Sequence, residues 1–361
     1  GKTQFFGGKA KAVEKHTRVK ARVVAHALRD LMEGADTVYV MGHHNEDYDC
    51  FGAALGVACM ARALGKSVHI VLSDMNEGID RFEDVLSKEE LYEGLFVRAG
   101  DVSRVASLSA LLVVVDAHIP HILAEPSLLD DVPKVVVIDH HRRSEQFVKN
   151  PLIVYIETSS SSASELVTEL LMYFSDNVRL TKYDATALYA GIVVDTKNFN
   201  VGAGVRTFDA AAYLRRAGAD PVLVRSLFQS DYETTVALAR AKAAAEFFPG
   251  GLIVGSIPEY LPNGQIIAAQ AADGMLRVDG VRMSIYVFQM AHDTVGISAR
   301  SSGDMNVQVI MEDFGGGGHA NVAGAQVKDI PLASVRARVI ERARAYIEES
   351  DQHESHIADG H

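Results

Sequence analysis

Residues 134–141 read KVVVIDHH, an apolar, β-branched run that ends in one aspartate and two histidines. Two further segments have the same form, LLVVVDAH at 111–118 and DTVYVMGHH at 36–44. Near-continuous apolar strands separated by helical segments are typical of a mostly parallel sheet that is covered on both faces. The expected fold class is therefore α/β, with a doubly wound sheet whose crevice lies at the carboxyl ends of its strands.

The remaining segments predict further elements and a second domain. Apolar spacing indicates a helix over 51–65, a strand over 67–73 and a mainly helical part from about 161 to 247. From about residue 249, strand-like runs enclose one helix, a glycine run follows at 315–318, and a last helix is predicted near 332–349. These features predict a second, smaller α/β domain.

We expect four parts along the chain. They are a lead-in helix over 1–35, the first domain over 36–240, the second domain over 241–348 and a polar tail over 349–361. The basic face of the lead-in helix is interpreted as solvated. The first residue is not methionine, which suggests a fragment whose anchor would lie upstream.

Composition excludes several classes of protein. With 361 residues and 48% hydrophobic residues, the chain has room for two cored domains. Its net charge of -12 argues against binding of long nucleic acid. No apolar run approaches the ~20 residues of a membrane helix, so we expect a cytoplasmic fragment without membrane contact. Cys50 and Cys59 lie on one predicted helix, too far apart along its axis for a disulfide, which indicates reduced thiols.

Acidic and imidazole side chains gather where the predicted strands end. The six candidate ligands are His43, Asp47, Asp49, Asp116, His140 and Asp195. Carboxylates that converge in one crevice repel each other unless cations lie between them, so the pattern predicts a metal site. Oxygen and imidazole donors without thiolates suit Mn²⁺, with Mg²⁺ or Co²⁺ as substitutes. Six ligands suit two ions about 3.5–4 Å apart that share a carboxylate, which we assign to Asp116.

Other roles are open for several of these residues. Asp47 and Asp49 could each cap the following helix, at about even odds with a ligand role. We expect Asp139 to support His140 rather than to bind metal. His118 is interpreted as a surface or packing histidine.

The segments HNEDYD, a strand-end Asp, DHH and VVDTKNF, in this order, resemble the signature of the DHH phosphoesterase superfamily. The resemblance implies a two-metal, Mn²⁺-dependent hydrolase. It assigns His43, Asp47 and Asp116 to one ion, and Asp49, Asp116, His140 and Asp195 to the other. His141 would contact substrate, and we take it as a hypothesis that it protonates the departing 3′ oxygen.

The second domain contains SARSS at 298–302 and GGGGH at 315–319. By itself, a glycine run is more often a flexible connection than a phosphate site. Together the two segments resemble the DHH-associated substrate-binding domain. The substrate-binding residues that this implies are Arg300, Ser301, Ser302, Gly316, Gly317, Gly318 and His319. An arginine fork suits phosphate or a base, and glycine amides can bind phosphate.

Over nearly the whole chain the motifs resemble the catalytic part of GdpP-type cyclic-di-AMP phosphodiesterases. The resemblance implies hydrolysis of cyclic di-AMP, or a related dinucleotide, to linear pApA. It also implies a parent protein that is anchored in the cell membrane by upstream helices. The chain departs from the pattern at His44, Glu46, Cys50 and Phe51, and every expected ligand is present. A second copy of the chain, in a homodimer, is the other partner that we consider.

Three alternatives are weighed against this function. The first is a nanoRNase or single-strand exonuclease with the same centre. A processive exonuclease needs a basic groove with stacking aromatics, and an acidic chain without Trp argues against it but leaves hydrolysis of dinucleotides open. An inorganic pyrophosphatase would need more cations than the single arginine of SARSS. A cyclic-dinucleotide receptor with lapsed catalysis would lack a metal ligand, and none is missing.

Overall fold

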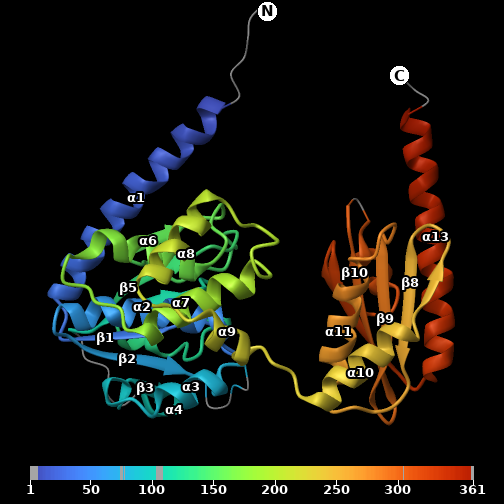
Figure 1. The fold of residues 1–361 in the computed structure, drawn as a ribbon, viewed down its shortest axis with the longest axis horizontal. Coiled ribbons are helices and arrows are strands. Elements are labelled where there is room, and N and C mark those ends of the chain that lie inside the picture. The colour runs from blue at the N-terminus through green and yellow to red at the C-terminus, as the bar shows by residue number, and fades with distance from the viewer. Residues whose placement is uncertain (1–6, 74–75, 77, 103–108, 304, 359–361) are drawn as a thin grey trace, which may run out of the picture. The chain divides into compact units, whose positions relative to one another are not determined.

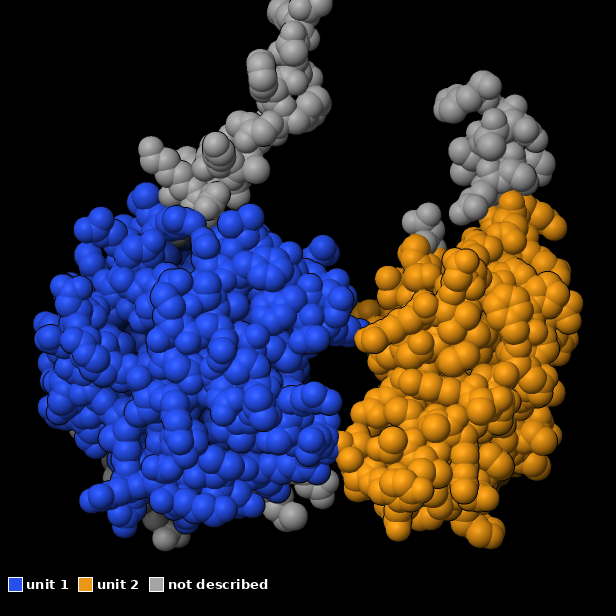
Figure 2. Space-filling view, in the orientation of Figure 1, with its two compact units in different colours: residues 1–229 blue, residues 230–361 orange. Residues whose placement is uncertain are grey.

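The computed structural model describes residues 7–73, 76, 78–102, 109–303 and 305–358 (Figure 1). The chain divides into two compact units, residues 1–229 and 230–361 (Figure 2). The division lies before helix α10 (Tyr232–Ala243), which packs against α11 (Gly264–Met275). The units therefore divide earlier in the chain than the expected boundary at 240/241, which lies inside α10.

The first unit contains a six-stranded sheet in which all strands are parallel, in the order β3-β2-β1-β4-β5-β6. Its strands are β1 (Thr37–Met41), β2 (Ser67–Leu72), β3 (Phe96–Arg98), β4 (Leu111–Val115), β5 (Lys134–Asp139) and β6 (Ile153–Ile156). The chain builds the sheet outward from β1 and then outward in the other direction from β4. This order confirms the doubly wound α/β prediction and puts the switch point between β1 and β4.

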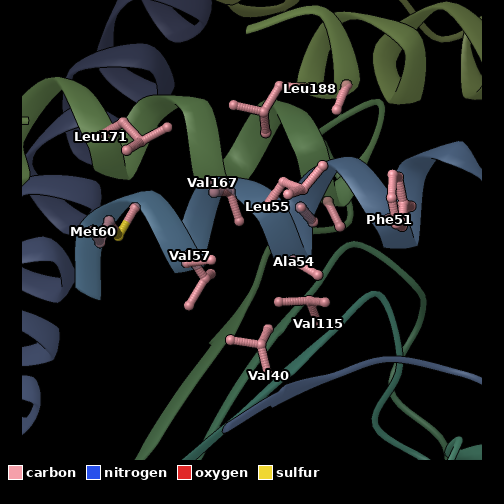
Figure 3. Close-up of a cluster of buried hydrophobic side chains, with 14 of the residues drawn as sticks. Val40, Phe51, Ala54, Leu55, Val57, Met60, Val115, Val167, Leu171 and Leu188 are labelled. Atoms are coloured by element: carbon pink, nitrogen blue, oxygen red, sulfur yellow. The ribbon is translucent and has the colours of Figure 1, made fainter. Parts of the chain in front are cut away.

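Helices cover both faces of this sheet. The helices of the unit are α1 (Gly7–Glu33), α2 (Tyr48–Ala63), α3 (Asp80–Leu86), α4 (Ala99–Val102), α5 (Leu128–Asp131), α6 (Ala163–Phe174), α7 (Lys182–Asp195), α8 (Val205–Arg216) and α9 (Pro221–Leu227), with 3-10 turns η1 (Glu90–Tyr92) and η2 (Pro120–Ile122). They form two layers on the face that α2 contacts, and the short helices α4 and α5 lie on the other face. Figure 3 shows α2 between Val40 and Val115 of the sheet on one side and Val167 and Leu188 of α6 and α7 on the other. Because α2 is enclosed in this way, its residues from Tyr48 to Ala61 are all buried, and most of them are apolar.

Close approach of α2 to α6 and α7 depends on glycine. A Cβ on Gly52 would lie 2.9 Å from Ser164 Oγ and closer still to the Ala187 carbonyl. A Cβ on Gly56 would meet the side chain of Val167. Residues with side chains at these two positions would push the helices apart.

We expect Gly52→Ala to destabilise the protein by about 1–3 kcal/mol, the usual cost of overpacking a core. Gly100→Ala is the matched control, since Gly100 is also helical and has open space around its Cβ position. It should be neutral or stabilising by up to about 1 kcal/mol, because alanine favours helix. Urea unfolding followed by circular dichroism measures both, and equal midpoints for the two variants would contradict the packing argument.

The second unit has a mixed sheet in the order β11-β12-β10-β9-β8-β7, in which β8 and β9 are parallel and the other pairs antiparallel. Its strands are β7 (Glu246–Phe248), β8 (Leu252–Ile257), β9 (Met283–Ala291), β10 (Thr294–Ser301), β11 (Gly317–His319) and β12 (Val322–Lys328). Helices α12 (Val307–Glu312) and α13 (Leu332–Ala358) cover one face, and α10 and α11 pack on the other. Helix α13 continues through most of the segment that was expected to be a polar tail.

Two expectations from composition can be compared with the fold. Within the described residues, none of the helices has both the length and the apolar character to cross a bilayer. Cys50 and Cys59 both lie in α2, where they are free and buried. Burial raises the pKa of the Cys59 thiol to about 11, so this thiol stays protonated at neutral pH.

Candidate functional site

The predicted ligands meet at the switch point of the parallel sheet. His43 follows β1, Asp116 follows β4 and His140 follows β5, while Asp195 is the last residue of α7. β1 and β4 are neighbouring parallel strands, and after them the chain continues toward opposite edges of the sheet. Their carboxyl ends therefore border the crevice in which such sheets bind ligands.

The six candidate ligands form two groups within which potential ligand atoms lie within 4.8 Å of one another. The groups are His43, Asp47 and Asp116, and Asp49, His140 and Asp195. A third group, Asp116, His140 and His141, overlaps both and includes one histidine that is not among the six. Asp116 faces both groups, because its Oδ2 is 3.5 Å from His43 Nε2 and its Oδ1 is 3.4 Å from His140 Nε2. His140 Nε2 is also 3.2 Å from Asp195 Oδ2. The structure thus brings together every residue of the expected ligand set, with Asp116 in the shared position.

Asp116 has an unusual backbone conformation. Its φ of 55° lies in the left-handed region, which aspartate tolerates better than most residues. Its N–H donates to Ile138 O at 2.9 Å, and its side chain is almost fully buried. A strained residue at the end of a central strand is common at functional sites, where the surrounding structure holds it in place.

The two aspartates of the β1–α2 segment combine capping with a place in the ligand groups. Asp47 is the N-cap of α2, and its Oδ1 accepts from the backbone N–H groups of Asp49 and Cys50 at 2.8 and 3.0 Å. Asp49 is fully buried and accepts from Ala163 N and Ser164 N, at 2.7 and 2.8 Å, in the first turn of α6. Amides at a helix N-terminus stabilise a carboxylate, so these two hydrogen bonds offset part of the cost of burying Asp49.

Electrostatics in the cluster are unfavourable without a cation. Burial and the nearby charges of Asp116 and Asp195 raise the pKa of Asp49 well above its usual value. Burial lowers the pKa of His140, but Asp116, Asp195 and Asp49 outweigh it and raise that pKa to about 11. Burial also lowers the pKa of His43, but the neighbouring Asp116 outweighs burial and raises that pKa to about 9. Both imidazoles therefore hold protons that a cation between the carboxylates would replace.

Two buried atoms point directly to a missing partner. Among the described residues, five buried side-chain atoms have no hydrogen bond of good geometry. Two of them, Asp116 Oδ1 and His140 Nε2, lie in this cluster, 3.4 Å apart. Buried polar atoms are rarely left unpaired, and these two are the usual ligand atoms of carboxylate and histidine. The donor set therefore fits divalent metal ions.

We expected Asp139, the aspartate of the DHH triplet, to support His140. In the structure it supports His141 instead. Asp139 Oδ1 accepts from His141 N at 3.1 Å and from His141 Nδ1 at 2.8 Å. Asp139 Oδ2 pairs with His118 Nδ1 at 2.5 Å. Burial opposes ionisation, but the bonds from His141 and His118 lower the pKa of Asp139 to about 2. The expectation was wrong because successive side chains at a strand end point in opposite directions.

Residues that depart from the family pattern have structural partners. Glu46 is buried and accepts from Ser73 N at 2.7 Å and Asn76 Nδ2 at 2.8 Å, which links the segment after β1 to the segment after β2. His44 N donates to Ile122 O at 2.7 Å. These contacts fix the segment between His43 and Asp47 from two sides.

The other two departures, Cys50 and Phe51, follow the candidate ligand Asp49 directly and are packed in the core. Cys50 lies against Gly42, where any side chain would collide with its Sγ. The Phe51 ring stacks on Phe96 with centroids 5.6 Å apart. Larger residues after Asp49 are thus accommodated by a glycine at the end of β1 and by an aromatic partner on β3.

A cavity of about 630 Å³ in the second unit brings together most of the expected substrate-binding residues. Among its lining residues are Gln265, Ser298, Arg300, Gly315, Gly316, Gly317, Gly318, His319 and Gln326. Ser301 and Ser302 do not line it, and their hydroxyls donate to Met305 O at 2.7 Å and Val281 O at 3.4 Å. Ser298, Gln265 and Gln326 were not predicted; alternation along the strand from Arg300 would have indicated Ser298 in place of Ser301.

Arg300 is held in a defined orientation at this cavity. Its Nε donates to Asp273 Oδ1 at 3.2 Å, and its Nη1 donates to Ser298 Oγ at 3.1 Å and to Ala299 O at 3.0 Å. The guanidinium is thus positioned before any ligand binds, which reduces the entropy lost on binding.

The two roles of Asp47 can be separated by substitution. Asp47→Asn keeps the capping oxygen but replaces the second carboxylate oxygen, so we expect the melting temperature in EDTA to stay unchanged. With Mn²⁺ at about 100 times its Kd, the wild-type protein should gain about 2.7 kcal/mol of stability, and the variant much less. Asp47→Ala should in addition lose about 1 kcal/mol in EDTA, because the helix loses its cap.

Differential scanning fluorimetry with EDTA and with Mn²⁺ measures both effects. Asp131→Asn, which removes an exposed carboxylate, is the control and should behave as wild type. A full Mn²⁺ response in Asp47→Asn would remove Asp47 from the ligand set.

Comparison with family models gives two matches. Residues 37–192 match the DHH family, N-terminal domain, and residues 257–349 match the DHHA1 domain. These segments contain, respectively, the residues before Asp195 of the candidate metal centre and the cavity around Arg300.

Curated proteins similar to this chain include a cyclic-di-AMP phosphodiesterase PdeA from Listeria monocytogenes, 42% identical over 96% of the chain. A cyclic-di-AMP phosphodiesterase GdpP from Bacillus subtilis is 39% identical over the same share. The chain covers 53% of each, so it spans about half the length of these relatives. A bifunctional oligoribonuclease and PAP phosphatase NrnA from Thermus thermophilus is 29% identical over 90% of the chain and 94% of its own length.

Among solved structures, an exopolyphosphatase-related protein from Bacteroides fragilis matches with a TM-score of 0.70. The match covers 90% of this chain and 96% of that one, at 17% identity. At this identity the likeness concerns the fold alone.

Proposed function

The chain carries a DHH family N-terminal domain followed by a DHHA1 domain, and we propose that it is a metal-dependent phosphodiesterase that hydrolyses cyclic di-AMP to linear pApA. The observation that carries the proposal is the pair of ligand groups that meet at Asp116, with unpaired ligand atoms between them. Such a pair suits two divalent ions, for which Mn²⁺ is our first choice and Mg²⁺ or Co²⁺ substitutes. Bound ions of this kind activate water and neutralise phosphate charge.

The side chains around the ligand groups have complementary roles in this proposal. Asp116 divides its two oxygens between the groups. His141 is largely exposed, and Asp139 holds its Nδ1, which leaves Nε2 available to a substrate. We assign to His141 the transfer of a proton to the departing 3′ oxygen. Arg300 and the glycine amides of 316–318 would bind the phosphates.

The choice of cyclic di-AMP comes from the relatives rather than from the geometry. Proteins 42% and 39% identical over 96% of the chain are named as cyclic-di-AMP phosphodiesterases. Cleavage of short oligonucleotides is the second candidate, because the NrnA relative aligns over nearly its full length. The setting that we propose, which is implied by the family resemblance, is the cytoplasmic part of a membrane-anchored protein.

The purified chain should be incubated with Mn²⁺ and, separately, with cyclic di-AMP, cyclic di-GMP, pApA and pyrophosphate. We expect chromatography to show pApA formed from cyclic di-AMP, and EDTA to abolish the reaction because the ligand groups lose their ions. Turnover of pApA alone would favour the oligonucleotide reading. Consumption of pyrophosphate alone would overturn the proposal, and binding of cyclic di-AMP without product would favour a receptor.

Loss of the cavity arginine should affect substrate affinity rather than the metal. Arg300→Ala removes charged hydrogen bonds worth about 1.5–3 kcal/mol each, so we expect kcat/KM for cyclic di-AMP to fall roughly 10–100-fold. The Mn²⁺-induced rise in melting temperature should not change, because Arg300 lies outside the ligand groups. Arg282→Ala, which breaks only an ion pair with Asp351, is the matched control. Equal kinetics for both variants would exclude Arg300 from substrate binding.

A further inference from the structure

His118 connects strand β4 to the loop that follows β5. Its side chain is 2% exposed, although it stands only two residues after Asp116. Its Nδ1 lies 2.5 Å from Asp139 Oδ2, and its Nε2 accepts from Ser144 N at 3.0 Å. Its carbonyl oxygen accepts from Val148 N at 3.0 Å. Three contacts thus tie this one residue to the segment that begins with the DHH triplet.

These contacts determine the tautomer of His118. A backbone N–H can only donate, so His118 Nε2 must be the accepting nitrogen toward Ser144. The ring proton is therefore on Nδ1, and it is donated to Asp139. The imidazole is used as a neutral, two-ended connector rather than as a metal ligand.

The Asp139 carboxylate then has one oxygen for each histidine. Oδ2 is occupied by His118, and Oδ1 accepts from both the backbone N–H and the Nδ1–H of His141. This arrangement fixes the direction of the His141 ring and keeps one proton on Nδ1. To protonate the departing oxygen, His141 must act as the imidazolium, whose second proton is on Nε2. The exposed Nε2 is the nitrogen left for chemistry.

Ring packing adds to the constraint. The His118 imidazole stacks on Phe147, with centroids 5.2 Å apart and planes at 28°. The Arg143 guanidinium lies over the same Phe147 ring, 4.6 Å from its centroid. The loop after β5 is thus closed around His118 by both hydrogen bonds and stacking.

We propose that His118 is a positioning residue for His141, acting through Asp139. The inference rests on the proposed function, in which His141 transfers the proton. An orienting partner beyond the directly acting group typically contributes 10–100-fold to activity. No such role was expected for His118, which had been interpreted as a surface or packing residue.

The test is a double-mutant cycle. His118→Phe keeps the ring and its stacking on Phe147 but deletes both hydrogen bonds. We expect kcat for cyclic di-AMP to fall about 10–100-fold, with KM and the Mn²⁺-induced rise in melting temperature unchanged. In a His141→Gln background, the same change should cost almost nothing further, because its effect passes through His141.

Two further variants separate positioning from folding. His118→Asn places an amide N–H where Nδ1 stands, so it should restore most of the lost kcat. His121→Phe, on the exposed turn η2, is the matched control and should keep the kcat of wild type. Equal losses of kcat from His118→Phe in both backgrounds, or no recovery in His118→Asn, would overturn the proposal.

A crystal structure of the His118→Phe variant gives a readout that does not need turnover. We expect the His141 ring to leave Asp139 Oδ1, and an unmoved ring would contradict the positioning role. If the wild-type chain cleaves none of the nucleotides, the proposed function fails. A displaced His141 ring would still support the connection through Asp139.

Discussion

Repulsion among buried carboxylates at the switch point is the constraint on which the first unit depends. Asp47, Asp49, Asp116 and Asp195 lie where β1, β4 and α7 end, and burial strengthens their mutual repulsion. Backbone amides of α6 and α2 offset part of the cost by donating to Asp49 and Asp47. The rest of the repulsion must be offset by protonated imidazoles, or by cations that replace their protons. The cluster is thus stable only as a set, because each carboxylate depends on groups supplied by other elements.

The helix packing serves the same cluster. Asp49 reaches the first turn of α6 because α2 lies close against α6 and α7, and Gly191 of α7 leaves the space: a Cβ there would stand 2.9 Å from Asp49 Cα. Helix α1 packs in turn along α6 through Ala21, Ala25 and Leu28. The lead-in helix therefore belongs to the core that holds the candidate ligand Asp49.

Much of this could be predicted because the strands and their last residues are adjacent in sequence. An apolar run that ends in Asp or His gives both the strand and the edge at which its side chain emerges, as for Asp116 and His140. Strands β3 and β6 have three and four residues, too short for a periodic signal. The contact of Asp139 with His118 could not be predicted from the sequence. It depends on the fold of the loop after β5, in which the Ser144 backbone N–H donates to His118. The family resemblance put Ser301 among the substrate-binding residues, but it does not line the cavity. Alternation along the strand from Arg300 indicated Ser298 instead.

The net charge of the chain restricts how it can bind an anionic ligand. With a net charge of -12, the protein does not attract an anionic dinucleotide at long range. Binding must therefore come from short contacts, and the cavity in the second unit offers few cations but several glycine amides and an arginine that Asp273 already orients. Contacts of this kind are made at van der Waals distance and are screened little by salt. A net negative charge disfavours long polyanions, whose affinity depends on an extended basic field. In the proposed function, a compact dinucleotide needs only short-range contacts of this kind.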